Sequence, residues 1–404
     1  MERIDQFWID SFETDKEKRE NCCGCSNCAN VCPVNAIKMD YDTEGYLYPR
    51  IDNSKCINCS ACFKVCPLHN KSGKKNDTLD VYASYSQNKD IIRRSASGGF
   101  ISELSRSFAR SGGLVFGVRY NEAYTRTEYA CANNEKELLS FSSSKYVQSE
   151  KNDVFKHIKN MLEIGRNVLV TGCPCDLASL KHFLHKDFSN LYTCELVCAG
   201  VTSPYVLEQY ISYVEHKCNS KISSLNMRSK KYGWYVSTLE EHFIDGTIRY
   251  TPFYGSFLGH AFSTYVRPSC LKCQFRGANS TSDFRVGDFW GIRPTDSFWN
   301  KNGVSCVFAA TERAQNIINN MNPQNVFVER LRNYDSLIKN ESIYENKSEK
   351  YISKRNQFAE WFIDFGLIRA CKETETFSYK VKRYIPGSIQ PKIKEIYHYF
   401  IDRR

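Results

Sequence analysis

The chain has 404 residues, of which 42% are hydrophobic and 25% are charged, and its formal net charge is +10 at pH 7. This composition is typical of a water-soluble globular protein with two or three domains, and it excludes a fibrous or disordered chain. No apolar run approaches the roughly 20 residues that cross a bilayer, and the charged N-terminus differs from a signal peptide. We therefore expect a cytoplasmic protein.

Cysteine is unusually frequent, with 19 residues, nine of them among the first 66. In a reduced cytoplasm, clustered cysteines serve metals or redox chemistry more often than disulfides. Residues 1–70 carry a net charge of −3, so the rest of the chain carries +13. A basic surface suits an anionic ligand, although it is more often simply solvated, and we expect no nucleic acid as a partner.

The first predicted domain, residues 15–70, contains one cysteine pattern twice. Each copy reads C-x2-C-x2-C-x3-C-P, and the second copy follows the first by 34 positions. A 4Fe-4S cluster needs four converging thiolates, and the x2 spacing lets one loop supply three of them. A structural zinc site is the alternative, which the exact repetition with both prolines disfavours. The cysteines of the two copies are Cys22, Cys25, Cys28 and Cys32, and Cys56, Cys59, Cys62 and Cys66.

This region resembles the bacterial two-cluster ferredoxins, in which the last cysteine of each run binds the other cluster. The resemblance implies a first cluster on Cys22, Cys25, Cys28 and Cys66, and a second on Cys56, Cys59, Cys62 and Cys32. Low-potential one-electron transfer is the expected task. Cys23 lies between ligands and receives no role.

Residues 69–78 are basic and polar, and this pattern predicts a linker. Beyond it, strand-like and helix-like segments alternate, which favours an α/β domain over residues 80–330. From residue 331 to 404 the pattern becomes helical, so the chain as a whole is expected to be α+β. The expected strands are 81–86, 114–120, 168–171, 191–197, 284–286 and 304–309, and the expected helices are 99–110, 153–163, 176–184 and 204–215.

Six segments of this second domain occur as a set and in a recognisable order. They are SASGGF (95–100), SSKYVQS (143–149), TGCPCDLASL (171–180), CELVCAGVTSP (194–204), RPSCLKC (267–273) and SDFRVGDFWG (282–291). Together they resemble the FrhB/FdhB family, the beta subunits of coenzyme F420-reducing hydrogenase and F420-dependent formate dehydrogenase. With the N-terminal ferredoxin unit, the arrangement is also similar to plant hydroxymethyl-chlorophyll reductase and to bacterial relatives found among polysaccharide-biosynthesis genes.

The resemblance implies FAD and one further 4Fe-4S cluster, with ligands at Cys175, Cys198, Cys270 and Cys273. From the residues alone, one C-x2-C pair and two scattered thiols could equally bind zinc or remain free. The chain departs from the family at Cys173 and Cys194, each close to an assigned ligand. The choices between Cys173 and Cys175 and between Cys194 and Cys198 therefore stay open.

For the flavin, no G-x-G-x-x-G pattern occurs, so no Rossmann site is predicted. Ser97, Gly98 and Gly99 instead begin a predicted helix, where free N–H groups and the helix dipole can hold a pyrophosphate. A plain helix N-cap explains the same residues. Lys145, followed by Tyr146, matches the family's flavin-contacting lysine, and a cation there would stabilise a reduced, anionic flavin.

The C-terminal region carries two amphipathic patterns. The apolar residues of 358–368 share one helical face, which indicates core packing, with a subunit interface in a homo-oligomer as the alternative. The basic tail, residues 391–404, could contact an anionic membrane surface, although a docked helix is favoured.

The sequence thus predicts an iron-sulfur flavoprotein oxidoreductase, in which FAD exchanges electron pairs with an organic substrate and clusters transfer single electrons. Its expected partners are an external ferredoxin or other redox protein and a small molecule, which the relatives suggest belongs to polysaccharide biosynthesis. The alternatives are a coenzyme F420-linked subunit of a larger complex and an electron carrier without its own substrate. The sequence identifies neither the substrate, nor the direction of electron flow, nor a catalytic acid or base.

Overall fold

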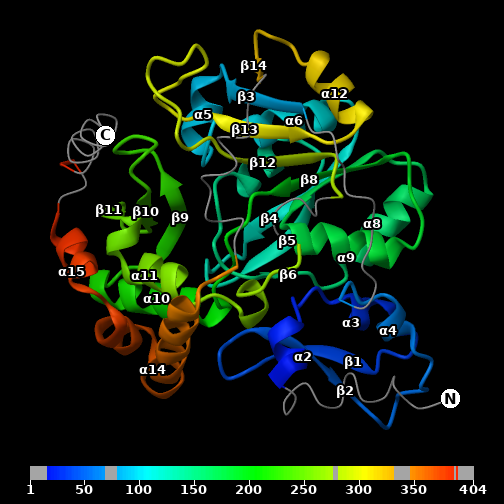
Figure 1. Ribbon diagram of the computed structural model, residues 1–404, viewed down its shortest axis with the longest axis horizontal. Helices are drawn as coiled ribbons and strands as arrows, with labels where there is room; N and C mark the ends of the chain where they lie inside the picture. The colour runs from blue at the N-terminus through cyan, green and yellow to red at the C-terminus, as the bar shows by residue number, and fades with distance from the viewer. Residues whose placement is uncertain (1–15, 69–79, 276–280, 332–345, 386–387, 390–404) are drawn as a thin grey trace.

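The computed structural model describes residues 16–68, 80–275, 281–331, 346–385 and 388–389. The predicted linker, residues 69–78, and the basic tail, residues 391–404, lie outside the described residues. All 19 cysteines lie within them. The N-terminal unit, the large sheet and a smaller sheet with helices around it are visible as separate groups of elements in Figure 1.

The N-terminal unit is a short antiparallel hairpin with helices on either side of it in sequence. The repeat in the sequence is also a repeat in the backbone. Gly24 and Asn58, 34 positions apart, both have positive φ, and so do Ser26 and Ser60, each of which precedes a short helix. The elements are α2 (Lys16–Asn21), α3 (Asn27–Val31), β1 (Ile37–Tyr41), β2 (Leu47–Ile51) and α4 (Ala61–Lys64).

In the described part of the chain, nine strands form the large sheet, in the order β14-β3-β13-β12-β8-β7-β4-β5-β6. Its centre, β12-β8-β7-β4, is parallel, whereas β13, β3 and β14 pair antiparallel along one side. The strands are β3 (Asp80–Ser86), β4 (Leu114–Tyr120), β5 (Thr127–Ala132), β6 (Ser149–Glu150), β7 (Val168–Gly172), β8 (Leu191–Leu196), β12 (Phe284–Asp288), β13 (Ser305–Ala309) and β14 (Val326–Leu331).

Helices cover both faces of this sheet because its central strands are apolar on both sides. Side chains of α6 (Phe100–Arg110) and α12 (Glu312–Asn319) share one buried cluster with the sheet, and those of α8 (Val154–Glu163) and α9 (Pro174–Leu184) share another. The N-terminal unit contacts α8 and α9 through α3, which brings it beside the sheet (Figure 1). Shorter helices α5 (Lys89–Arg94), α7 (Glu135–Leu138) and η1 (Leu139–Phe141) lie in the connections.

A second, three-stranded antiparallel sheet of described residues has the order β11-β10-β9. It packs with α10, α11 and α14 into a core that also includes Tyr46 and Tyr48 of the N-terminal unit. The elements are α10 (Pro204–Cys218), β9 (Ile222–Ser229), β10 (Thr238–Phe243), β11 (Ile248–Pro252), η2 (Phe253–Gly255), α11 (Phe257–Thr264), η3 (Pro268–Cys270), α14 (Glu349–Thr374) and α15 (Phe377–Tyr384).

The mixed α+β class is confirmed. The predicted strands and helices of residues 80–330 all occur, within a few residues of their expected ends, whereas the small sheet β9–β11 was not predicted. The C-terminal helices are present, but the expected apolar face is interrupted. Phe358 and Phe362 are buried, whereas Phe365 is 62% exposed and directly precedes Gly366, which leaves the helical conformation with φ of 78°.

No helix among the described residues is both long enough and apolar enough to span a membrane.

Candidate iron-sulfur and flavin sites

The N-terminal unit encloses a cavity of about 30 Å³ that is lined by thiols. Burial raises the pKa of the Cys28 thiol well above its ordinary value, and the neighbouring thiols of Cys25 and Cys22 add to this effect. Backbone N–H groups face the sulfurs, since Gly24 N donates to Cys22 Sγ at 3.4 Å. The lining cysteines are Cys22, Cys23, Cys25, Cys28, Cys62 and Cys66.

These features fit a 4Fe-4S cluster. Crowded, buried thiolates repel one another, and N–H donors to sulfur are a common feature of cluster sites. The cavity gathers all four ligands that the ferredoxin resemblance assigns to the first cluster. Among the described residues, no group of three or more His, Cys, Asp or Glu side chains converges as the ligands of a single metal ion do.

The cysteines of the second run are less enclosed. Burial raises the pKa of Cys62. A hydrogen bond from the Phe63 backbone opposes this rise, and the neighbouring thiols of Cys59 and Cys56 add to it. Cys32 Sγ accepts a hydrogen bond from Ala36 N at 3.2 Å. The assignment of Cys56, Cys59, Cys62 and Cys32 to the second cluster remains a prediction.

A second cysteine-lined cavity, of about 50 Å³, lies at the edge of the large sheet. Parallel strands β7 and β8 end side by side, so the residues that follow them meet at that edge. Cys173 and Cys175 follow β7, Cys198 follows β8, and η3 supplies the Cys270 side. The lining cysteines are Cys23, Cys173, Cys175, Cys198, Cys270 and Cys273.

The thiols of this second cavity interact closely with one another. Cys173 and Cys198 form a side-chain hydrogen bond, which is the largest cause raising the pKa of Cys173. Burial raises the pKa of Cys270 to about 12, and the nearby Cys198 and Cys273 add to it. The four ligands that the FrhB/FdhB resemblance implies therefore share one cavity with Cys173, and the donor set fits a cluster.

The structure narrows one of the two open ligand choices. Cys194 is buried in the hydrophobic core on β8, together with Phe100 and Phe284, and does not line the cavity, whereas Cys198 does. Cys173 and Cys175 both line it, so that choice stays open. Under their loop, Lys151 Nζ lies 2.9 Å from Asp176 Oδ1, and Tyr129 donates to Asp176 Oδ2 at 3.0 Å, which fixes the start of α9.

Two residues missed by the sequence reasoning connect the cavities. Cys23 lines both cavities. Arg267, which is 1% exposed, donates to Cys22 O at 2.7 Å and to Leu47 O at 2.9 Å. The doubled cysteine at positions 22 and 23 was a visible signal for the first. Arg267 begins the segment RPSCLKC, in which only the cysteines received a role.

The predicted pyrophosphate loop does begin a helix, but its contacts are internal. Ser97 Oγ donates to Val304 O at 2.7 Å. A Cβ on Gly98 would lie 2.2 Å from Ser84 O, so packing against β3 explains this glycine. Gly99 is the N-cap of α6, with φ of 93°. The plain N-cap interpretation accounts for these contacts, and flavin binding at this loop stays a prediction.

The surroundings of Lys145 and Tyr146 fit a flavin better than those of residues 97–99 do. Lys145 Nζ donates to Ser142 O at 3.0 Å and lies 5.3 Å from the centre of the Tyr120 ring. Burial lowers the pKa of Lys145 to about 7. A partly desolvated ammonium of this kind would gain from an anionic ligand, as a reduced flavin is. Tyr146 packs on Phe262, with 4.3 Å between the ring centres.

Arg228, on β9, contacts the first of the two predicted flavin segments. It is 4% exposed, and it donates to Asp288 Oδ1 at 3.0 Å and to Ala96 O at 3.3 Å. Burial raises the pKa of Tyr146 to about 12, and the Arg228 charge opposes that rise. Lys230 Nζ donates to Ser97 O at 2.6 Å. Arg228 and Lys230 therefore hold the backbone of residues 96–97. No sequence pattern indicated Arg228.

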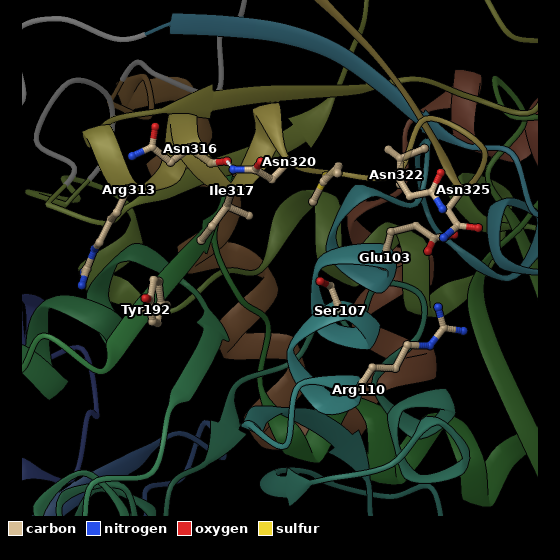
Figure 2. Close-up of a pocket in the computed structure, with 12 residues that line it drawn as sticks. Glu103, Ser107, Arg110, Tyr192, Arg313, Asn316, Ile317, Asn320, Asn322 and Asn325 are labelled. Carbon is tan, nitrogen blue, oxygen red and sulfur yellow. Dashed lines mark hydrogen bonds between the residues drawn. The ribbon is translucent and has the colours of Figure 1, made fainter.

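The most spacious cavity described here, about 510 Å³, lies elsewhere, between α6 and α12. Figure 2 shows Glu103, Ser107 and Arg110 on α6, Arg313 and Asn316 on α12, and Asn322 and Asn325 beside Glu103. Arg110 is paired with Glu135, and Arg313 is paired with Asp283, at 2.6 Å each. The cavity contains none of the predicted site residues, and its arginines already have acidic partners.

Comparison with known proteins gives matches to both the N-terminal unit and the second domain. Residues 165–331 match the family of the C-terminal region of the coenzyme F420 hydrogenase/dehydrogenase beta subunit, and residues 21–70 match the 4Fe-4S dicluster domain. No curated protein matches the chain. A chain in the structure "Xenon derivatization of the F420-reducing [NiFe] hydrogenase complex from Methanosarcina barkeri" is 17% identical, with a TM-score of 0.45, over 72% of this chain and 94% of that chain.

Proposed function

Because the chain belongs to the coenzyme F420 hydrogenase/dehydrogenase beta-subunit family and carries an N-terminal 4Fe-4S dicluster domain, we propose that it is an iron-sulfur flavoprotein oxidoreductase. The two matches themselves indicate an iron-sulfur electron-transfer protein related to that family. The proposal adds FAD, a third cluster and a small organic substrate. When bound, clusters supply one-electron transfer and FAD supplies two-electron exchange.

The proposed division of the chain follows the cysteine sites. Residues 15–70 would hold two clusters, residues 80–330 would hold the third cluster and FAD, and residues 331–404 would form a helical extension. The proposed ligands of the third cluster are Cys175, Cys198, Cys270 and Cys273, with Cys173 as the alternative to Cys175.

One observation carries this proposal. Thiols from four separate segments converge on one cavity in the second domain, and that cavity adjoins the first through Cys23. Free buried cysteines would need no such convergence, whereas a cluster needs four thiolates around it. The adjacency also supports electron exchange between the two domains.

Side chains at and beside the two predicted flavin segments would hold the flavin. Lys145 would place a positive charge beside the ring, and Arg228 and Lys230 would keep the backbone of residues 96–97 in position. The aromatic contacts of Tyr146 with Phe253 and Phe262 would exclude water from one side. Ser97, Gly98 and Gly99 would contribute through the start of α6.

A coenzyme F420-linked subunit is the second candidate. The family match favours it, because the matched family is that of coenzyme F420 hydrogenase and dehydrogenase beta subunits. The net positive charge beyond residue 70 would suit a polyanionic cofactor. The partners of a protein with this role would be other redox proteins of a larger complex.

Anaerobically reconstituted protein separates these functions. Flavin bound at about one per chain and reduced by reduced ferredoxin, but not by reduced F420, would support the oxidoreductase with an external ferredoxin. Rapid flavin reduction by reduced F420 would favour the second candidate. Clusters without any flavin would contradict both and leave an electron carrier.

A further inference from the structure

Four arginines of the described chain are buried, and three of them form an ion pair with a carboxylate. A buried guanidinium is costly without a counter-charge, so such pairs are expected. The three pairs are Arg228–Asp288, Arg285–Glu195 and Arg355–Glu44. The fourth arginine, Arg267, is 1% exposed and forms no ion pair with any carboxylate of the described residues. Its counter-charge must therefore come from another kind of group.

The hydrogen-bond partners of Arg267 are all neutral. Nε donates to Cys22 O at 2.7 Å, Nη2 donates to Leu47 O at 2.9 Å, and Nη1 donates to Gln148 Oε1 at 3.0 Å. The guanidinium carbon also lies 4.2 Å from the centre of the Tyr48 ring. These contacts fix the guanidinium and satisfy its donors, but none of them carries a full negative charge.

Arg267 lies beside the cysteines of both cavities. It lines the second cavity together with Cys270 and Cys273. It also lies against the turn of the first cysteine run, since a Cβ on Gly24 would be 3.1 Å from the guanidinium carbon. A 4Fe-4S cluster held by four thiolates is negatively charged, and reduction increases that charge. The clusters are therefore anions of the kind that Arg267 lacks among the described carboxylates.

We propose that Arg267 supplies the counter-charge of the first cluster, on Cys22, Cys25, Cys28 and Cys66, and that the second domain thereby raises the reduction potential of this cluster. The inference rests on the proposed function, because it requires a cluster at these cysteines. A fixed, buried cation stabilises the reduced cluster more than the oxidised one, since the reduced cluster carries the greater negative charge. Arg267 acts through its charge and provides no ligand.

Two substitutions of Arg267 separate its charge from its hydrogen bonds. Arg267→Gln removes the charge, whereas Arg267→Lys keeps the charge but loses the planar fork. Each full chain is reconstituted anaerobically, and iron per chain and the midpoint potential of each cluster, followed by electron paramagnetic resonance, are measured. Arg50→Gln is the matched control, because Arg50 belongs to the N-terminal unit and its ion pair with Asp40 is about half exposed.

A further variant leaves Arg267 in place and gives it the carboxylate that it lacks. Gln148 is 2% exposed, and its Oε1 accepts the bond from Arg267 Nη1. Gln148→Glu has nearly the same shape, and the neighbouring guanidinium favours its ionised form. The new negative charge should offset that of Arg267. This variant keeps the test open if the Arg267 variants fail to fold.

We expect Arg267→Gln and Gln148→Glu to keep the iron of the wild type and to lower the potential of one N-terminal cluster. The expected change is about tenfold in the one-electron equilibrium, which is about 59 mV. Arg267→Lys should stay close to the wild type. Arg50→Gln should change the potential much less, because water and salt screen an exposed charge.

Four results would overturn the inference. Unchanged potentials in Arg267→Gln with full iron would reject it and leave the proposed function intact. An equal fall in Arg267→Lys would assign the effect to hydrogen bonds and not to charge. If neither Arg267 variant keeps its iron, an unchanged potential in Gln148→Glu would reject the inference. A wild-type chain that holds zinc in place of iron would remove both the inference and the proposed function.

Discussion

The two cysteine-lined cavities are built in different ways. The first takes Cys22, Cys25 and Cys28 from one turn of chain and adds Cys66 from the repeated copy. The second takes its thiols from the ends of two parallel strands, from the η3 turn and from the N-terminal unit. The first therefore depends on local backbone conformation, whereas the second forms only when distant segments have folded together.

The largest expected effect is a loss of iron from the second cavity alone. Cys270→Ala should remove about four of about twelve irons per chain, because the third cluster loses a ligand while the two N-terminal clusters keep theirs. Iron quantification after anaerobic reconstitution measures this, with Cys218→Ala as the control, because Cys218 lines neither cavity. Unchanged iron in Cys270→Ala would count against that ligand.

The second largest expected effect is a loss of stability when Arg267, which joins the two cavities, is replaced. Arg267→Ala should lower the free energy of unfolding by about 3 kcal/mol, because it leaves the buried acceptors Cys22 O and Leu47 O without their donor. Arg50, whose ion pair with Asp40 is half exposed, is the control, and Arg50→Ala should cost less than about 1 kcal/mol. Denaturant unfolding of the two variants measures the difference, and equal losses would mean that Arg267 does not anchor the domains.

A smaller effect tests whether the glycine before α6 serves packing. Gly98→Ala should destabilise the protein by about 1–3 kcal/mol, because its Cβ would meet Ser84 O at 2.2 Å and Ser305 N at 2.6 Å. Gly98 lines neither cysteine cavity, so the clusters should keep their iron. Thermal unfolding and iron content together measure this outcome. Wild-type stability with loss of flavin would instead indicate that Gly98 faces the cofactor.

The smallest expected effect is a dependence of the protein's stability on pH. Burial lowers the pKa of Lys145 from 10.5 to about 7, so between these pH values the unfolded chain binds more protons than the folded chain. Stability should therefore rise with pH across that window, and the full penalty should persist below pH 7. Lys145→Met should be more stable than the wild type at pH 7, with an advantage that narrows by pH 9. Melting temperatures of flavin-free protein measure this, and a constant difference would contradict it.

The contrast between the cavities also explains what could be predicted from the sequence. The x2 spacing shows local ligands directly, so the dicluster domain was identified from the residues and confirmed by the family match. The ordered strands and helices of residues 80–330 followed from hydrophobic periodicity. The second cavity could be predicted only through a family resemblance, because nothing in the local spacing brings Cys198 to Cys270.

Other parts of the site left no local signal. Arg228 and Asp288 are 60 positions apart, and their ion pair depends on how β9 meets the end of β12. The small sheet β9–β11 was missed because its strands are short and partly polar. Cys23 was visible as half of a Cys-Cys pair, but its place in the lining of both cavities depends on the contact between two domains.

The most direct test of this account is the iron and flavin content of the full chain after anaerobic reconstitution. Three clusters predict about 12 irons per chain, accompanied by about one FAD. A protein with zinc in place of iron, or with about eight irons and no flavin, would contradict the central claim that the second domain holds a cluster and a flavin.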